Sequence, residues 1–201
     1  HGREVGATAV DVDVSEGFGQ TVTVRMNEVE TIEYNRSKDL GVTVYFDKRS
    51  GYASSSDFSP RSIADTVRAA ASIAKFTASD EANGLAEPEL LCRDVRDLDL
   101  YHPWDVSVDR AIELARACEA AAFRLDKRIA NSDGSSVSTQ QFQAVSANSN
   151  GFVGSIVSSR QYISCSVIAA EDGQMQRDDW YSTARSASEL ARPEAIGDYA
   201  G

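Results

Sequence analysis

The side chains that most often activate water or bind zinc are scarce in this sequence. It contains only two histidines, His1 and His102, and histidine is the commonest general base and zinc ligand. Asp99 and Asp105 lie near His102, so a catalytic or metal role is one interpretation. The other is a loop residue whose ring packs beside Trp104. No HExxH segment occurs, so this chain alone cannot assemble a zincin-type site.

The three cysteines, Cys92, Cys118 and Cys165, are far apart and odd in number. No two of them have the spacing of metal ligands. The pattern argues against a disulfide framework and favours the reducing cytoplasm. Because free cysteine is among the most buried residue types, all three are predicted to be small core side chains.

Hydroxyl and carboxylate groups are frequent but lack activating partners. Ser54–Ser56 and Ser135–Ser136 are rich in hydroxyls, yet no G-x-S-x-G, P-loop or G-x-G-x-x-G pattern occurs. Glu171–Asp172 and Asp178–Asp179 flank an expected hairpin, where carboxylates face solvent more often than they bind a metal. The sequence therefore predicts no catalytic residue, no cofactor-binding residue and no metal ligand in this chain.

Composition is that of an ordinary soluble globular protein, with 201 residues, 42% hydrophobic and 25% charged. The net charge of −11 repels phosphate, so nucleic-acid binding is not expected. No apolar run approaches the ~20 residues that a membrane helix needs, so no membrane association is expected. The predicted location is the cytoplasm.

The first part of the chain predicts short antiparallel strands and then a helix. Gly17–Gly19 reads as a break, and Asn35–Asp39 as a turn. Lys48–Gly51 reads as a hairpin connection that leads into a small, hydroxyl-rich return arm. Ser59 and Pro60 predict a helix start, and the helix should end near Thr77. The expected strands are Ala7–Ser15, Thr21–Met26, Val29–Tyr34 and Gly41–Asp47.

A stretch without periodicity, residues 78–106, separates this part from a second helix. Such a connection is either functional or a wrap over the surface. Ser107 predicts the cap of the second helix, which runs to about Arg124. Ser188–Tyr199 reads as a broken helix or a tail. The later strands are Ile129–Ser132, Val137–Gln143, Gln143–Ser149, Phe152–Ser158, Tyr162–Glu171 and Gln174–Thr183, with turns at Asp133-Gly134, Asn148–Gly151 and Asp172-Gly173.

Together these elements predict an α+β fold in the order strands, helix, loop, helix, strands. A mostly antiparallel or mixed sheet should carry two helices packed on one face, in two layers. Residues 1–201 are expected to form a single domain.

Several segments resemble the N-terminal domain of the TldD/PmbA proteins, which are often labelled modulators of DNA gyrase and grouped with zinc peptidases. The resemblance covers nearly the whole chain, and Asp97–Pro103 (DLDLYHP) resembles the PmbA branch, also called TldE. The segments are Asn27–Asn35, Gly41–Tyr45, Arg49–Ser55, Asp57–Pro60, Asp97–Pro103, Val106-Ser107, Ala111–Ala115, Asp126–Ile129, Asn148–Phe152, Ser164–Ala169 and Glu171–Asp178.

The resemblance implies the N-terminal half of a longer PmbA-like protein. In that family the TldD branch carries zinc-binding histidines in its second half, and the PmbA branch lacks them and pairs with TldD. No zinc ligand of the family falls on a residue of this chain. Zinc is therefore expected only in a TldD-like partner subunit, self-association is the other expected assembly, and the gyrase label is read as indirect.

These observations suggest a non-catalytic, substrate-guiding and assembly half of a metallopeptidase complex that holds an unfolded peptide by strand addition. The alternatives are a plain protein–protein interaction scaffold and a self-sufficient hydrolase. The candidate peptide-contacting residues share small size and strand position, and they are Ala53, Ser54, Ser55, Ser56, Ser136 and Ser138.

Overall fold

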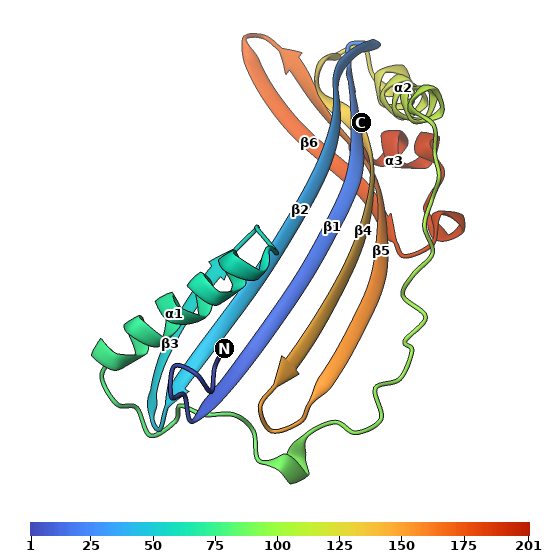
Figure 1. Ribbon diagram of the computed structural model, residues 1–201. Coiled ribbons are helices and arrows are strands. Elements are labelled where there is room, and N and C mark those ends of the chain that lie inside the picture. The colour runs from blue at the N-terminus through green and yellow to red at the C-terminus, as the bar shows by residue number, and fades with distance from the viewer. The chain divides into compact units, whose positions relative to one another are not determined.

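The computed structural model describes all residues from His1 to Gly201 (Figure 1). One antiparallel sheet has the strand order β3-β2-β1-β4-β5-β6 and is accompanied by three helices, which confirms the predicted α+β class. The strands are β1 (Ala9–Arg25), β2 (Glu28–Phe46), β3 (Arg49–Ser55), β4 (Ile129–Asn148), β5 (Val153–Glu171) and β6 (Gln174–Ala184). The helices are α1 (Pro60–Phe76), α2 (Val108–Leu125) and α3 (Pro193–Ala200), with 3₁₀ turns at Pro88–Leu90 and Ala187–Glu189.

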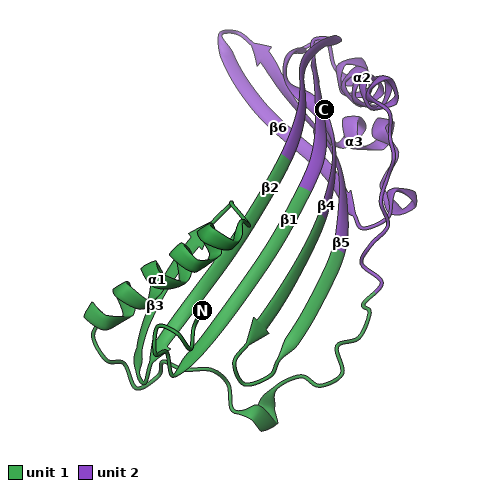
Figure 2. Ribbon diagram, viewed as in Figure 1, with its two compact units in different colours: residues 1–17, 36–98, 142–157 green, residues 18–35, 99–141, 158–201 purple.

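The chain divides into two compact units, shown in Figure 2. Unit 1 comprises residues 1–17, 36–98 and 142–157, and unit 2 comprises residues 18–35, 99–141 and 158–201. Strands β1, β2, β4 and β5 contribute residues to both units, so each unit contains a portion of the sheet and at least one helix.

In unit 1, α1 packs on β2 and β3. Ser59 accepts a hydrogen bond from the backbone N–H of Ser62, and Pro60 opens the helix, which confirms the predicted start. Gly51 of β3 allows the contact, because a Cβ atom there would lie 2.3 Å from the carbonyl oxygen of Ala70. The buried side chains of this core are Leu40, Val42, Val44, Val67, Ala70 and Ala71.

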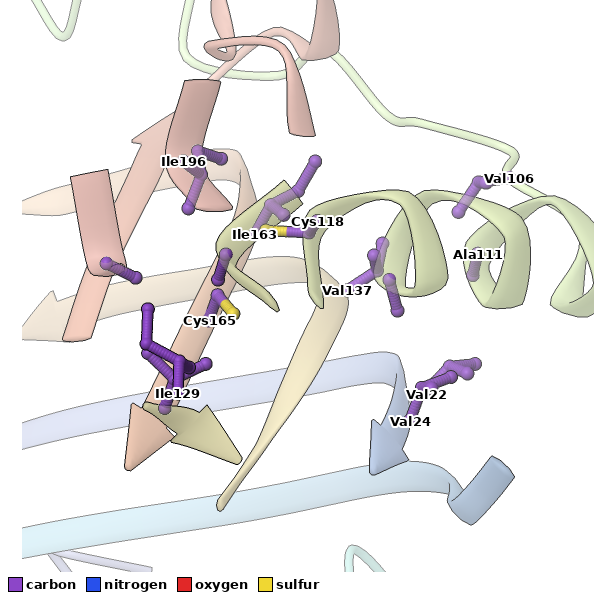
Figure 3. Close-up of a cluster of buried hydrophobic side chains, with 14 residues drawn as sticks. Val22, Val24, Val106, Ala111, Cys118, Ile129, Val137, Ile163, Cys165 and Ile196 are labelled. Atoms are coloured by element: carbon purple, nitrogen blue, oxygen red, sulfur yellow. The ribbon is translucent and has the colours of Figure 1, made fainter. Parts of the chain in front are cut away.

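In unit 2, α2 and α3 cover one face of the strands, and Figure 3 shows the side chains that meet there. Ser107 caps α2 as predicted, by accepting from the backbone N–H of Arg110. Gly197 brings α3 against α2, since a Cβ atom there would lie 2.0 Å from the carbonyl oxygen of Cys118. The core includes Val22, Val24, Val137, Ile163, Cys165, Val167 and Ile196.

The strands are longer than the sequence predicts, because three predicted breaks lie inside them. Gly17–Gly19 lies within β1, where a Cβ atom on Gly19 would meet the carbonyl oxygen of Thr139 at 2.4 Å. Asn35–Asp39 lies within β2, and Glu16 of β1 bonds the side chain of Arg36 there. Asp133-Gly134 lies within β4, where Gly134 has a φ of 115°. Glycine serves here for close approach and local irregularity rather than for chain reversal.

Two hairpins were predicted with unequal success. The Asp172-Gly173 turn is confirmed, with φ of 50° and 78° and the flanking pair Glu171 and Gln174. The predicted Lys48–Gly51 connection is wrong in register. The turn residues are Asp47 and Lys48, Asp47 has a φ of 54°, and Gly51 already pairs with Val44. The early strand start follows from the two-residue turn, which Asp47 accommodates without glycine.

The structure agrees with the predictions for residues 78–106 and shows which of the two alternatives holds for the final segment, a broken helix or a tail. Residues 78–106 contain one 3₁₀ turn and no longer element, and the final segment forms a 3₁₀ turn followed by α3. No helix has both the length and the apolar character needed to cross a membrane.

Candidate functional site

Strand β3 ends the sheet on one side and leaves its outer edge unpaired. Its register with β2 begins at the pair Phe46 and Arg49, next to the two-residue turn. Backbone hydrogen bonds alternate along an antiparallel pair, so Ser50, Tyr52 and Ser54 direct their N–H and C=O groups away from β2. Such groups are a template for another extended chain.

A hollow of about 430 Å³ lies between this strand and the first turns of α1. Three of the predicted peptide-contacting residues line it, Ala53, Ser54 and Ser55. The opposite wall comes from residues that follow β3 in the sequence. These are Asp57, Ser59, Arg61, Ser62, Asp65, Thr66 and Ala69. The hollow is therefore lined by small, hydroxyl-bearing and charged side chains, and by no large apolar one.

Hydrogen bonds hold the lining of the hollow in place. The hydroxyl oxygens of Ser55 and Ser62 lie 2.8 Å apart and join β3 to α1. The backbone N–H of Asp57 donates to Ser55 Oγ at 3.1 Å. The Asp57 carboxylate in turn accepts from the backbone N–H and the hydroxyl of Ser59, each at 2.9 Å. These bonds to the backbone and hydroxyl of Ser59 lower the pKa of Asp57 below its ordinary value.

We expect Asp57 to titrate at lower pH in the folded chain than the value of about 3.9 in unstructured peptides. The pKa of Asp57 is lower in the folded state than in the unfolded state, so the ionised carboxylate stabilises the start of α1 above the unfolded-state pKa. This stabilisation is lost as the pH falls through the folded-state pKa. A carbon-detected NMR titration of the carboxyl group measures it. Ser59→Ala should return the pKa towards its ordinary value, and an unchanged pKa in that variant would contradict the assignment.

The other predicted residues lie elsewhere. Ser56 is exposed just after β3 and is not part of the lining. Ser136 and Ser138 belong to β4 in unit 2, where their hydroxyls bond Thr23 Oγ1 at 2.9 Å and Thr21 Oγ1 at 3.0 Å. β4 is paired with β1 and β5, which use its backbone N–H and C=O groups, so only the side chains of these serines are available to contact a ligand. The two predicted groups belong to different units.

The cysteines are only partly as predicted. Cys118 and Cys165 are buried in the core of unit 2, but Cys92 is exposed in the irregular connection. The prediction for Cys92 is wrong because residues 78–106 pack few side chains into either core. A hydrogen bond with Cys118, together with burial, raises the pKa of the Cys165 thiol, which keeps it protonated and unreactive.

His102 has mainly structural contacts. Its Nε2 lies 2.9 Å from the carbonyl oxygen of Asp99, and its backbone N–H donates to Ser159 Oγ at 2.8 Å. No group of three or more His, Cys, Asp or Glu side chains is placed to hold a metal ion.

One buried acidic residue was not predicted. Glu119 of α2 is 2% exposed, and its carboxylate accepts from the backbone N–H groups of Met26 (2.9 Å) and Asn27 (2.7 Å). The signal was present in the sequence, since Glu119 falls among Ala115, Cys118 and Ala122 in the apolar stripe of the helix.

Comparison with known proteins decides the family. Residues 10–74 match the family described as PmbA/TldA metallopeptidase domain 1, and residues 101–201 match the PmbA/TldA metallopeptidase central domain. The chain belongs to the PmbA/TldA metallopeptidase family. The resemblance drawn from the sequence is thereby confirmed.

Among curated members of this family, Metalloprotease PmbA of Escherichia coli O157:H7 is 45% identical over 196 residues, which is 98% of this chain and 43% of that protein. The PmbA homolog of Haemophilus influenzae is 39% identical over 195 residues, 97% of this chain and 43% of that protein. The chain thus spans less than half the length of these PmbA relatives.

Solved structures show the same fold at lower identity. A candidate modulator of DNA gyrase from Bacteroides thetaiotaomicron matches with a TM-score of 0.90 at 23% identity, over 99% of this chain and 46% of that one. TldE from Thermococcus kodakarensis matches with a TM-score of 0.80 at 19% identity, over 99% of this chain and 44% of that one. The arrangement of strands and helices in this PmbA/TldA family member therefore has solved counterparts.

Proposed function

We propose that this chain is a non-catalytic, substrate-guiding and assembly part of a metallopeptidase, and that it holds an extended peptide along the outer edge of β3. The observation that carries the proposal is the unpaired edge of β3 beside a hollow lined by Ala53, Ser54 and Ser55. Its membership of a metallopeptidase family supplies the reaction class.

Strand addition explains how such an edge binds peptides of many sequences. The N–H and C=O groups of Ser54 can pair with the backbone of the peptide, which every sequence carries. Small side chains at this end of β3 leave room for the incoming chain, while every second peptide side chain can enter the hollow. The Asp57 carboxylate, kept ionised by its bonds to Ser59, adds negative charge at that wall.

The proposal assigns hydrolysis to another part of the assembly. In this proposal a TldD-type partner would hold the zinc, and this chain would supply binding and assembly rather than metal ligands. Pairing with that partner is the preferred assembly, and self-association is the second. A cytoplasmic location is consistent with three free cysteines. The charge of −11 supports a peptide rather than a nucleic acid as the ligand.

Photocrosslinking of the full-length protein with its partner tests the peptide site. A photoreactive amino acid at Ser54 should capture a labelled unstructured peptide, and the same amino acid at Ser56, which lies outside the lining, should capture much less. If both positions fail while the peptide is still cleaved, the plain scaffold becomes the better description of the chain.

We expect Ser54→Pro to weaken retention of the same peptide by about tenfold, because it removes an outward N–H that the peptide would use. Ser56→Pro, beyond the end of β3, is the matched control and should bind as the wild type does. Fluorescence anisotropy with the labelled peptide measures both. Equal affinities for the two variants would contradict a backbone contact at Ser54.

A further inference from the structure

A second strand edge, in unit 2, is also unpaired. β2 lies between β1 and β3 in the sheet, but β3 covers only Leu40–Phe46 of it. The outer edge of β2 over Glu28–Asn35, hereafter the acidic edge, therefore has no strand paired with it, and it belongs to the purple part of β2 in Figure 2. All of its residues are exposed.

The acidic edge lacks most of the features that protect strand edges in other proteins. It contains no proline, no lysine and no glycine, and natural edges are commonly guarded by lysine, proline or a bulge. It also exposes three large apolar side chains, with Val29 38%, Ile32 45% and Tyr34 70% accessible. A row of open backbone groups next to exposed apolar side chains is a pairing surface.

The turn that begins the acidic edge is held rigidly. Met26 and Asn27 have φ of 52° and 65°, and both of their N–H groups bond Glu119. Arg116 Nε donates to the carbonyl oxygen of Asn27 at 3.0 Å. A strand that is already ordered loses little entropy when another strand pairs with it.

The two-residue turn also sets which amides are available. β1 ends at Arg25 and β2 begins at Glu28, so these residues form the hydrogen-bonded closing pair of the hairpin. Backbone bonds alternate from that pair onwards, and the N–H groups of Val29 and Thr31 therefore point away from β1.

The negative charge of the acidic edge determines which kind of strand can pair with it. Glu28, Glu30 and Glu33 lie in the acidic edge, and Arg25 Nη1 is 3.6 Å from Glu30. Pairing of two copies about a two-fold axis would bring all these glutamates of both copies into one patch, which like-charge repulsion opposes. A strand that carries lysine or arginine at alternate positions would instead be attracted.

We propose that the acidic edge, Glu28–Asn35, is a docking site for a basic, extended segment of a different polypeptide, which pairs with β2 and extends the sheet. This surface is separate from the hollow beside β3 and its assignment does not depend on peptide binding there. Side chains alternate between the two faces of a strand, so Val29 would contact the incoming strand on one face and Ile32 and Tyr34 would contact it on the other. The three glutamates would select the charge of the incoming strand.

A labelled peptide of alternating lysine and valine tests the proposal with the purified full-length protein, and a peptide of alternating glutamate and valine is its matched partner. We expect the lysine peptide to bind about tenfold more tightly at low salt and to lose that advantage as salt rises. It should also slow hydrogen exchange at the amides of Val29 and Thr31. The combined charge reversal E28K/E30K/E33K should invert the preference between the peptides.

Two proline variants distinguish strand pairing from general electrostatic attraction. Thr31→Pro removes an outward N–H of the acidic edge and should abolish exchange protection and tight binding. Met175→Pro places proline at an outward position of another strand, the first one after the β5–β6 turn, and should bind normally. Protection at β3 or β6 instead of β2 would overturn the proposal. So would concentration-dependent protection of Val29 without peptide, because a second copy would then be the occupant.

Discussion

Replacing Glu119 with alanine is expected to lower the free energy of unfolding of the chain by about 3 kcal/mol. Its carboxylate is 2% exposed and accepts two backbone N–H bonds, at 2.9 and 2.7 Å, from the turn between β1 and β2. Alanine removes both acceptors and leaves a cavity between α2 and the turn. Urea unfolding followed by circular dichroism measures the loss.

Both lost hydrogen bonds lie in the turn between β1 and β2, so the first effect of the substitution should be local to that turn. Amide hydrogens of Met26 and Asn27 should exchange faster in Glu119→Ala than in the wild type, before any change in the rest of unit 2. Glu119→Gln, which keeps one acceptor oxygen, should be intermediate. Glu113→Ala is the matched control on the same helix, because Glu113 is an exposed residue that pairs with Arg110, and it should change stability by less than about 0.5 kcal/mol. A Glu119→Ala chain as stable as this control would mean that the turn does not need the carboxylate.

The helices were predictable because their signals are local. Ser59-Pro60 and Ser107 each combine a capping hydroxyl with an apolar stripe in the following residues, and both helices begin where that signal lies. Glu119 was missed because its contacts are not local. An acidic residue inside an apolar stripe is visible in the sequence, but its partners, Met26 and Asn27, lie far away in the chain.

The strand lengths were not predictable from turn-forming residues alone. Gly19 and Gly134 have sequence surroundings typical of breaks, yet Gly19 provides space for the carbonyl oxygen of Thr139, and Gly134 adopts a positive φ within β4. Asn35–Asp39 stays extended within β2, where Arg36 and Lys38 form ion pairs with Glu16 of β1. These are contacts between segments distant in sequence, which periodicity does not report.

Three of the ten residues that line the hollow beside β3 were singled out in the sequence. Small side chains at Ala53–Ser55 predicted room for another backbone, and the structure leaves that edge unpaired. The wall made by Asp57, Ser59 and Arg61 arises only because α1 turns back over β3. Its position depends on Gly51, which the sequence suggested to be a turn residue and which instead sets the distance between strand and helix.

Gly51→Ala is therefore expected to destabilise unit 1 by about 3 kcal/mol. The new Cβ atom would lie 2.3 Å from the carbonyl oxygen of Ala70 and 2.4 Å from the backbone nitrogen of Ala74, and neither backbone atom can move without displacing α1. Displacement of α1 also separates Ser62 from Ser55, so peptide crosslinking at Ser54 should fall in the same variant. Urea unfolding and the crosslinking yield measure the two effects.

Gly41→Ala supplies the matched control, because it introduces the same methyl group on the adjoining strand. Its Cβ atom would meet the hydroxyl oxygen of Tyr52 at 2.9 Å, but that side chain is 56% exposed and can turn away into solvent. The expected loss is less than about 1 kcal/mol. A loss for Gly51→Ala as small as the loss for Gly41→Ala would show that β3 and α1 can separate without cost, and Gly51 would then have no role in shaping the hollow. A large loss confined to Gly51→Ala would establish that close approach of helix and strand forms the wall against which a peptide could lie.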